Sequence, residues 1–142
     1  MPALTSLTLV QMQRLLRTRR VSASELLQAH IERIEKHDAP IHAIVVRDFA
    51  RARAKARASD RRLAVGTAGP LEGIPVSIKE AINVHGLATT VGNPAYGNFV
   101  SAHDAPTVAR LKAAGAVILG KTNVPPEMAD WQAANPVYGR TN

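Results

Sequence analysis

The side chain in this sequence best placed to do chemistry is a lysine at the end of a short apolar stretch. The stretch reads Pro75-Val76-Ser77-Ile78-Lys79-Glu80. Because side chains alternate along an extended backbone, Pro75, Ser77 and Lys79 share one face, and Val76, Ile78 and Glu80 share the other. On this pattern alone, a lysine that extends to solvent is the more common arrangement. The alternative is a buried lysine, since burial disfavours the ammonium form and leaves a neutral amine that can accept a proton from a serine hydroxyl.

The nearest hydroxyl group along the chain belongs to Ser77, but its geometry does not suit a nucleophile. Two residues along a strand are about 7 Å apart, and their side chains stand roughly parallel. Proton transfer between Ser77 and Lys79 would need a bridging group. We therefore expect Ser77 to have a supporting or structural role.

Other common catalytic and metal-binding patterns do not fit this chain. It has no cysteine, which excludes disulfides, thiolate metal sites and a cysteine nucleophile. Its five histidines, at positions 30, 37, 42, 85 and 103, form no short-spaced pair of the kind that binds zinc on a helix. The segment 115–122 has the spacing of a phosphate-binding loop, but an apolar stretch typical of a strand lies between its two glycines.

A strongly basic segment raises the question of nucleic-acid binding. Residues 47–62 contain seven basic and two acidic side chains, a large part of the net charge of +7. Alanines at positions 50, 54 and 58 recur at helical spacing and predict a narrow small-residue stripe on a closely packed helix. No aromatic residue stands among the arginines of positions 51–62 to stack on single strands. The pattern therefore favours a solvated helix face without nucleic acid as a partner, and weak anion binding stays open.

Composition indicates a globular protein with a core of its own. The chain has 142 residues, of which 46% are hydrophobic and 20% charged. No apolar run approaches the roughly 18 residues of a membrane-spanning helix. The segment from Met1 to Ser6 does not combine a basic region with an apolar stretch, so it does not resemble a signal peptide. We expect a cytoplasmic protein that has no membrane partner.

The first half of the chain is typical of helices. Thr8–Gln11 and Ser22–Glu25 fit the capping-box pattern of helix starts, and Asp38-Ala39-Pro40 is expected to end the second helix. The residues expected to face inward are Met12, Leu15 and Leu16 in the first helix, and Leu27, Ile31 and Ile34 in the second. A short strand at 41–46 and the basic helix follow. A turn-rich stretch at 66–70 is the nearest feature to a linker.

The second half alternates strands with a helix, which indicates the α/β fold class. Pro75 should begin its strand or lie on a sheet edge, since proline cannot donate to a ladder. Asp104 is expected to cap a helix with Pro106 in its first turn and Gly115 as its stop, before a buried strand at 116–119. A short helix is expected after the prolines at 125 and 126. Residues 135–142 have the pattern of a loop that docks on nothing.

The order of short blocks in this chain resembles that of the amidase signature family. The most specific block is residues 69–80, Gly-Pro-Leu-Glu-Gly-Ile-Pro-Val-Ser-Ile-Lys-Glu. The later blocks are Thr89–Gly92, Asp104–Val108, Ala114–Ala116, Gly120–Asn123, Glu127–Met128 and Asn135–Asn142. Each block alone is weak evidence, whereas their joint order and spacing are specific. The resemblance extends from about residue 7 to residue 142.

The resemblance implies a mixed β-sheet flanked by helices, and amide hydrolysis by a Ser–cis-Ser–Lys triad without metal or organic cofactor. Lys79 matches the triad lysine. Met128, with Ala129 beside it, matches a position that lines the acyl-binding channel, although a core methionine is an equally weighted interpretation. The two serines and the oxyanion hole of such enzymes lie beyond position 142. The chain therefore resembles the N-terminal portion of one amidase domain, with a helical entry region at 1–65 and the start of the signature core at 66–142.

The resemblance also bears on subtype and partners. The family usually has aspartate at the position of Glu80 and often serine at that of Asn93, and neither change affects Lys79. Residues 124–129 are unlike the corresponding block of glutamine-dependent tRNA amidotransferase subunits, which favours a stand-alone amidase. A small-molecule amide substrate is implied, and a homodimer is an arrangement open to the full-length enzyme. The alternatives are an inactive truncated fragment, a small basic binding module, and an assembly fragment that pairs with a separately encoded C-terminal part.

Overall fold

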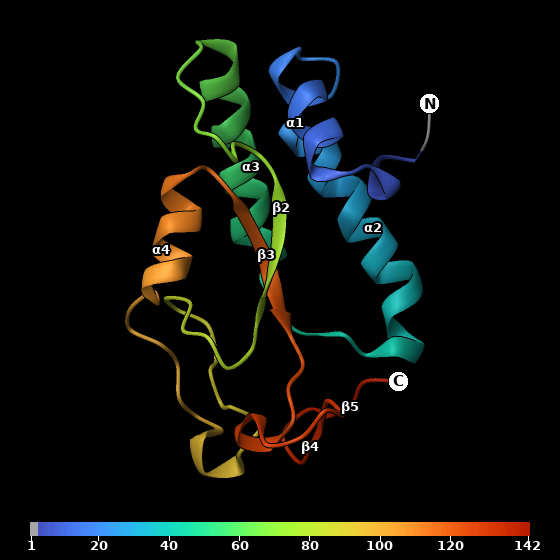
Figure 1. Ribbon diagram of the computed structural model, residues 1–142, viewed down its shortest axis with the longest axis vertical. Coiled ribbons are helices and arrows are strands. Elements are labelled where there is room, and N and C mark those ends of the chain that lie inside the picture. Colours follow the sequence, from blue (N-terminus) through green and yellow to red (C-terminus); the bar gives the residue numbers. More distant parts are fainter. Residues whose placement is uncertain (1–2) are drawn as a thin grey trace. The chain divides into compact units, whose positions relative to one another are not determined.

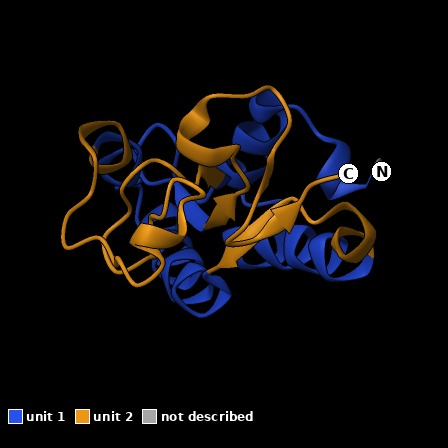
Figure 2. Ribbon diagram, turned by 90° about the horizontal axis from the view of Figure 1, so that it is seen from below, with its two compact units in different colours: residues 1–36, 48–76, 110–119 blue, residues 37–47, 77–109, 120–142 orange. Residues whose placement is uncertain are grey.

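A computed structural model describes residues 3–142 and divides the chain into two units, each built from three separate stretches of sequence. Unit 1 comprises residues 1–36, 48–76 and 110–119, and unit 2 comprises residues 37–47, 77–109 and 120–142. Figure 2 shows the two units in different colours. The chain thus passes between the units several times, and neither unit is a continuous segment.

A three-stranded mixed sheet confirms the α/β class. Its strands are β1 (Ile44–Arg47), β2 (Pro75–Lys79) and β3 (Val117–Thr122), in the order β1-β3-β2. β1 and β3 are antiparallel. Hydrogen bonds from Val117 N to Ile74 O and from Glu80 N to Thr122 O join β2 and β3 start to start and end to end, as in a parallel pair. The helix α4 (Pro106–Ala113) connects these two strands in a β-α-β crossover (Figure 1).

Proline and glycine occupy the places that the sequence predicted for them. Pro75 is the first residue of β2, which is an edge strand. Gly115 follows α4 with φ +98°, a left-handed conformation in which a β-carbon would lie 2.8 Å from the Cα of Glu72. A glycine is therefore required where the chain turns from α4 into β3. β3 itself continues to Thr122, beyond the expected end at 119, because Lys121 also faces inward and is buried.

Capping boxes begin two helices, as predicted. α1 (Leu9–Arg17) follows Thr8, whose Oγ1 accepts from Gln11 N at 3.3 Å while its N–H donates to Gln11 Oε1 at 2.8 Å. α2 (Ala23–Ile41) follows Ser22, which exchanges the equivalent pair of bonds with Glu25 at 2.8 and 3.0 Å. Of the residues expected to face inward, Leu16, Leu27 and Ile31 are buried, and Met12, Leu15 and Ile34 are half-buried.

α2 ends at Ile41, after the segment 38–40 that was predicted to stop it. Pro40 is inside the last turn; it has no N–H to donate to the preceding turn, which weakens the helix there, and the helix ends one residue later. His42 then takes a positive φ of 59°, and the buried Asp38 accepts hydrogen bonds from Ala43 N at 2.8 Å and Ile44 N at 3.2 Å. β1 therefore begins at 44, and the predicted strand start at 41 is wrong.

The basic segment forms α3 (Phe49–Ala64), but the predicted small-residue stripe is wrong. The buried residues are Ala52, Ala56 and Ser59, whereas the alanines at 50 and 54 are exposed and that at 58 is half-buried. Alternation of alanine with basic residues produces two similar stripes, offset by two positions. The stripe that leads to Ser59 faces inward because its hydroxyl donates to the buried carboxylate of Glu72.

Several basic side chains of α3 have partners within unit 1. Arg51 lies 2.8 Å from Asp48, and Arg53 Nε donates to Gln28 Oε1 at 3.3 Å. These contacts are typical of a solvated helix face that packs on one side.

Unit 2 contains the 3-10 turns η2 (Pro94–Tyr96) and η3 (Pro126–Met128), and a two-stranded sheet of β4 (Ala134–Asn135) and β5 (Gly139–Arg140). The last residues dock on the end of α2 and the residue after it: Asn142 N donates to Ile41 O at 2.9 Å, and Thr141 Oγ1 donates to His42 O at 2.7 Å. The prediction of a loop that docks on nothing is therefore wrong. The partners lie about a hundred positions away, where a local pattern carries no signal. Within residues 3–142, no helix combines the length and apolarity that crossing a membrane requires.

Candidate active site

Lys79 is the last residue of β2, and its side chain is exposed. The alternation expected along β2 is confirmed, since Ile78 and Glu80 are buried while Ser77 and Lys79 are both exposed. The alternative of a buried Lys79 is wrong for residues 3–142, because β2 is the edge strand and the described residues leave this face uncovered. The roles of Lys79 as a base and of Ser77 as a supporting residue stay predictions.

The residue after Lys79 is a fully buried carboxylate with every oxygen in use. Glu80 has 0% exposure. Its Oε1 accepts from Thr90 N at 2.6 Å and from Tyr138 Oη at 2.9 Å, and its Oε2 accepts from Val91 N at 3.0 Å. A buried carboxylate needs such donors, because leaving its charge unpaired would cost several kcal/mol. Three hydrogen bonds to its carboxylate therefore fix the position of the residue directly after Lys79.

Lys121 is the positive counterpart of Glu80 and the buried lysine of unit 2. Its exposure is 0%, and its Nζ donates to Ala88 O at 2.5 Å and to Thr89 Oγ1 at 2.7 Å. Burial lowers the pKa of Lys121 from 10.5 to about 8, although the charge of Glu80 acts in the opposite direction. Desolvation alone would thus select Lys121 as a base, but its amine is enclosed and already bonded to the protein.

The sequence interpretation missed Lys121, although a signal for it was present. It lies two and four residues after Leu119 and Val117, so it shares their face of β3, and all three side chains are buried. The glycine at position 120, which gives segment 115–122 the spacing of a phosphate-binding loop, is required by packing. A β-carbon on Gly120 would overlap the carbonyl oxygen of Val46 on the neighbouring strand. The rejection of a phosphate-binding loop agrees with the position of residues 117–122 in a strand.

Tyr138 and two asparagines attach the C-terminal segment to the same polar core. Burial raises the pKa of Tyr138 to about 12, and the neighbouring Glu80 carboxylate acts in the same direction. Asn135 Nδ2 donates to Asn123 Oδ1 at 2.8 Å and to Val124 O at 2.7 Å, while Asn135 Oδ1 accepts from Tyr138 N at 2.8 Å. The block 135–142 thus supports the residues around Glu80.

The predicted substrate-binding residues Met128 and Ala129 are both exposed, Met128 at 47%. The expected helix here is a single 3-10 turn, in which Glu127 and Met128 both have positive φ, at 49° and 59°. Consecutive left-handed non-glycine residues are strained, by about 1–3 kcal/mol each, and persist only where neighbours hold them. Glu127 N donates to Val91 O at 2.7 Å, and Asn93 Nδ2 donates to Glu127 Oε1 at 2.8 Å. Exposure argues against the core-methionine interpretation within residues 3–142, and the substrate role stays a prediction.

An open pocket lies within unit 2, and Ala81, one of its lining residues, is two positions after Lys79. Its volume is about 310 Å³, and its lining residues are Ala81, Asn83, Thr89, Val91, Tyr96 and Phe99. Tyr96 and Phe99 are half exposed, at 52% and 48%. Thr89 belongs both to this wall and to the contacts of Lys121. The pocket is large enough for a small organic group.

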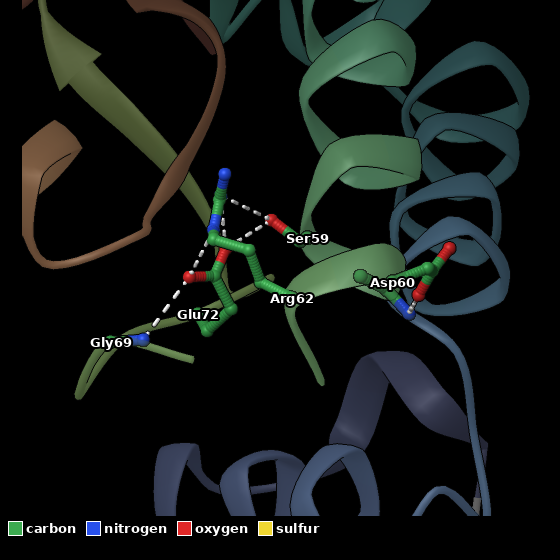
Figure 3. Close-up of polar contacts among 6 residues, drawn as sticks. Ser59, Asp60, Arg62, Gly69 and Glu72 are labelled. Carbon is green, nitrogen blue, oxygen red and sulfur yellow. Dashed lines mark hydrogen bonds and ion pairs between the residues drawn. The ribbon is translucent and has the colours of Figure 1, made fainter. Parts of the chain in front are cut away.

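A second buried carboxylate organises unit 1 (Figure 3). Glu72 accepts from Arg62 through both oxygens, Nε to Oε2 at 2.9 Å and Nη2 to Oε1, and further from Ser59 Oγ and from Gly69 N at 3.1 Å. Burial would raise the pKa of Glu72, but the hydrogen bonds and charge of Arg62, with those from Ser59 and Gly69, hold it at about 2. Because every donor comes from the protein, Glu72 acts as a structural anchor for the block at 69–80.

An aspartate of α3 caps the start of α2. Asp60 accepts from Ala23 N at 2.6 Å, and its other oxygen accepts from Ser24 N at 3.2 Å and Ser24 Oγ at 2.6 Å. A carboxylate at a helix N-terminus also interacts favourably with the helix dipole. Across residues 3–142, no three histidine or acidic side chains gather in a way that could hold a metal ion.

Comparison with known proteins shows which family this chain is similar to. A family model described as "Amidase" matches residues 25–142. A glutamyl-tRNA(Gln) amidotransferase subunit from Roseiflexus castenholzii is 46% identical over 123 residues, which are 87% of this chain and 25% of that protein. The putative amidase AmiB2 of Mycobacterium tuberculosis is 45% identical over 105 residues, 74% of this chain and 22% of that protein. The chain thus spans about a quarter of the length of these curated relatives.

Solved structures agree with this assignment. The peptide amidase of Stenotrophomonas maltophilia has a TM-score of 0.88 and 30% identity, over 96% of this chain and 30% of that one. A complex described as vestigial, from the study of an s-triazine catabolic enzyme, has a TM-score of 0.91 and 33% identity, over 96% and 30% of the two chains. Both matches confirm the fold over nearly all of the chain, and the family model covers most of it. The chain therefore belongs to the amidase signature family.

Proposed function

We propose that the protein hydrolyses linear amide C–N bonds and that Lys79 is its catalytic base. The observation that carries the proposal is the placement of Lys79, whose amine is exposed at the end of β2 while the next residue, Glu80, is fully buried and bonded on both oxygens. The backbone of the base is thus held in position, as a catalytic group requires, and its amine is open to a partner. Membership of the amidase family supports the same chemistry.

In the proposed reaction, a proton passes from a nucleophilic serine through a cis-serine to the neutral amine of Lys79. The serine oxygen bonds to the amide carbon, and the C–N bond breaks as the relay returns the proton to the leaving nitrogen. Water then attacks the acyl-enzyme by the same relay and releases the acid. We infer that both serines and the oxyanion hole lie outside residues 1–142, and that their segment covers the exposed face of β2. The desolvation that makes a lysine basic would come from that cover.

For the substrate, we propose a small-molecule amide whose acyl group contacts Met128 and Ala129. The exposure of Met128 supports this role. The relatives include both amidotransferase subunits and amidases at similar identity, so the preference for a stand-alone amidase rests on residues 124–129. The proposed cytoplasmic location rests on the composition, with its lack of cysteine. A stand-alone enzyme needs no partner protein for turnover.

The test compares isolated residues 1–142 with the protein expressed from its complete coding sequence, using hydrolysis of an aryl anilide. We expect the isolated chain to be inactive and the complete protein to be active without partners. Lys79→Ala in the complete protein should lower kcat by at least about a thousandfold, the scale seen when a member of a catalytic triad is removed. Lys79→Arg should be equally inactive, since a guanidinium remains protonated at the pH values at which enzymes work.

Lys36→Ala serves as the matched control, because Lys36 is an exposed lysine on α2. It should retain the activity of the parent protein. Unchanged turnover in Lys79→Ala would refute the assignment of the base. Turnover by isolated residues 1–142 that Lys79→Ala abolishes would instead refute the inference that the nucleophile lies outside this chain.

A further inference from the structure

A chain of contacts joins the residue after the proposed base to the turn that carries the proposed substrate-binding residues. It begins at Glu80, whose two oxygens accept the N–H groups of Thr90 and Val91 at 2.6 and 3.0 Å. Val91 has a positive φ of 50°, so this loop takes a conformation that a β-branched residue rarely adopts unless it is held. The carboxylate of Glu80 supplies that hold from inside unit 2.

The same loop holds the turn at 127–129. The carbonyl of Val91 accepts from Glu127 N at 2.7 Å, and Asn93 Nδ2 donates to Glu127 Oε1 at 2.8 Å. Both contacts fall on a residue with positive φ, directly before Met128, whose φ is also positive. A strained turn depends on such contacts for its conformation. The orientation of the exposed Met128 side chain therefore depends on the contacts that residues 91–93 make with Glu127.

Lys121 supports the other end of the loop. Its Nζ binds Ala88 O and Thr89 Oγ1, one and two residues before Thr90. The loop is thus held by a buried cation at 88–89 and by a buried anion at 90–91. Lys121 lies in β3 and Glu80 directly follows β2, the neighbouring strand of the same sheet.

We propose that Glu80 is a positioning residue for substrate binding, which acts through residues 90–93 on the turn of Met128 and Ala129. Glu80 does not itself touch substrate. One buried carboxylate thereby sets both the end of the strand that bears Lys79 and the turn beside the acyl group. This inference rests on the proposed function for the meaning of the turn, whereas the coupling between Glu80 and the turn is a property of the fold.

The coupling is tested first, by amide hydrogen exchange in the protein expressed from its complete coding sequence. Glu80→Gln keeps the size of the side chain but removes one acceptor, so an N–H group faces an N–H group at Thr90 or Val91. We expect exchange of the amide of Glu127 to become at least about tenfold faster. Tyr138→Phe is the matched control: it removes a donor to Oε1 and leaves both backbone contacts, so exchange at Glu127 should change by less than about threefold.

The consequence for function is tested by steady-state kinetics of the same variants. For amides with bulky acyl groups, Glu80→Gln should raise KM by at least about tenfold with a smaller change in kcat. The backbone bond from Glu80 N to Thr122 O still holds the end of β2 in this variant, whereas the turn at 127–129 loses its support. Glu80→Asp keeps the charge and should restore KM to within about threefold of the parent value. If Glu80→Gln only destabilised the fold, KM would not change selectively for amides with bulky acyl groups, and Glu80→Asp would not restore KM for that class alone.

Each outcome separates this inference from the proposed function. Unchanged exchange at Glu127 in Glu80→Gln, or a fall in kcat with constant KM, would overturn the positioning role. Retained activity in Lys79→Ala would overturn the proposed function and leave the exchange result untouched.

Discussion

Neutralising the buried carboxylate of unit 1 should destabilise the chain more than any surface charge change nearby. Glu72→Gln preserves shape, but its amide can replace only one of the two oxygens as an acceptor. The arginine, serine and glycine donors then compete for that oxygen. Hydrogen bonds to charged groups contribute about 1.5–3 kcal/mol each. Because the Arg62 side chain is 35% exposed and can turn to water, we expect a net loss of about 2–3 kcal/mol.

The pH dependence gives an independent measure of the same quantity. The pKa of Glu72 falls from its ordinary 4.5 to about 2 in the folded state, so its contribution is complete above pH 4.5 and disappears as the pH falls towards 2. At 1.36 kcal/mol per pH unit, this interval corresponds to at most about 3 kcal/mol, before screening is considered. The free energy of unfolding of the parent chain should therefore approach that of Glu72→Gln between pH 4.5 and 2.

The assay is urea denaturation followed by far-ultraviolet circular dichroism at pH 7, 4 and 2.5. Asp48→Asn is the control, since it removes the pair with Arg51, whose side chain is 50% exposed, and should cost less than about 1 kcal/mol. If Glu72→Gln destabilises the chain no more than Asp48→Asn at pH 7, the carboxylate is not the anchor inferred from its contacts. A difference that stays constant down to pH 2.5 would refute the linkage argument.

Three further predictions concern other anchors. Asp60→Ala removes the cap of α2 and should lower the free energy of unfolding by about 1–2 kcal/mol, measured by urea denaturation, with Glu25→Gln as a second cap variant for comparison. Gly115→Ala places a β-carbon 2.7 Å from Glu72 Oε2 at φ +98°, and should cost more than about 2 kcal/mol but add little to Glu72→Gln, because both disturb one site. Burial lowers the pKa of Lys121 to about 8, so folding disfavours its proton, and stability from this group should rise between pH 8 and 10.5 by at most about 3 kcal/mol; the rise should be absent in Lys121→Met.

Features that depend on near neighbours in sequence were predictable. Both capping boxes pair residues three positions apart, and the alternation along β2 and the turn at Gly115 follow from local stereochemistry. The alternation placed Lys79 on the exposed face of β2, whereas its role as a base rests on the family resemblance and stays a prediction. Its exposure depends on what covers that face, which no local pattern describes.

Features that depend on distant partners were not predictable in the same way. Lys121 binds Thr89 across 32 positions, and Asn142 Nδ2 binds Pro40 O across 102. The choice between the two alanine stripes of α3 was decided by Glu72, which lies 13 positions from Ser59. In each case the sequence supplied a polar residue of the right type, and only the tertiary structure named its partner.

The interleaving of the two units gives them different completion times during synthesis. The last stretch of unit 1 ends at residue 119, whereas unit 2 needs residues 120–142. Ribosomes add about 5–20 residues per second, so unit 2 lacks its final stretch for about one to five seconds after unit 1 is complete. Residues 77–109 spend this interval without Lys121 and Tyr138. During this interval Glu80 can bond to Thr90 and Val91 within its own stretch, but it lacks the hydroxyl of Tyr138 and the compensating charge of Lys121, so its carboxylate stays partly hydrated on the nascent chain.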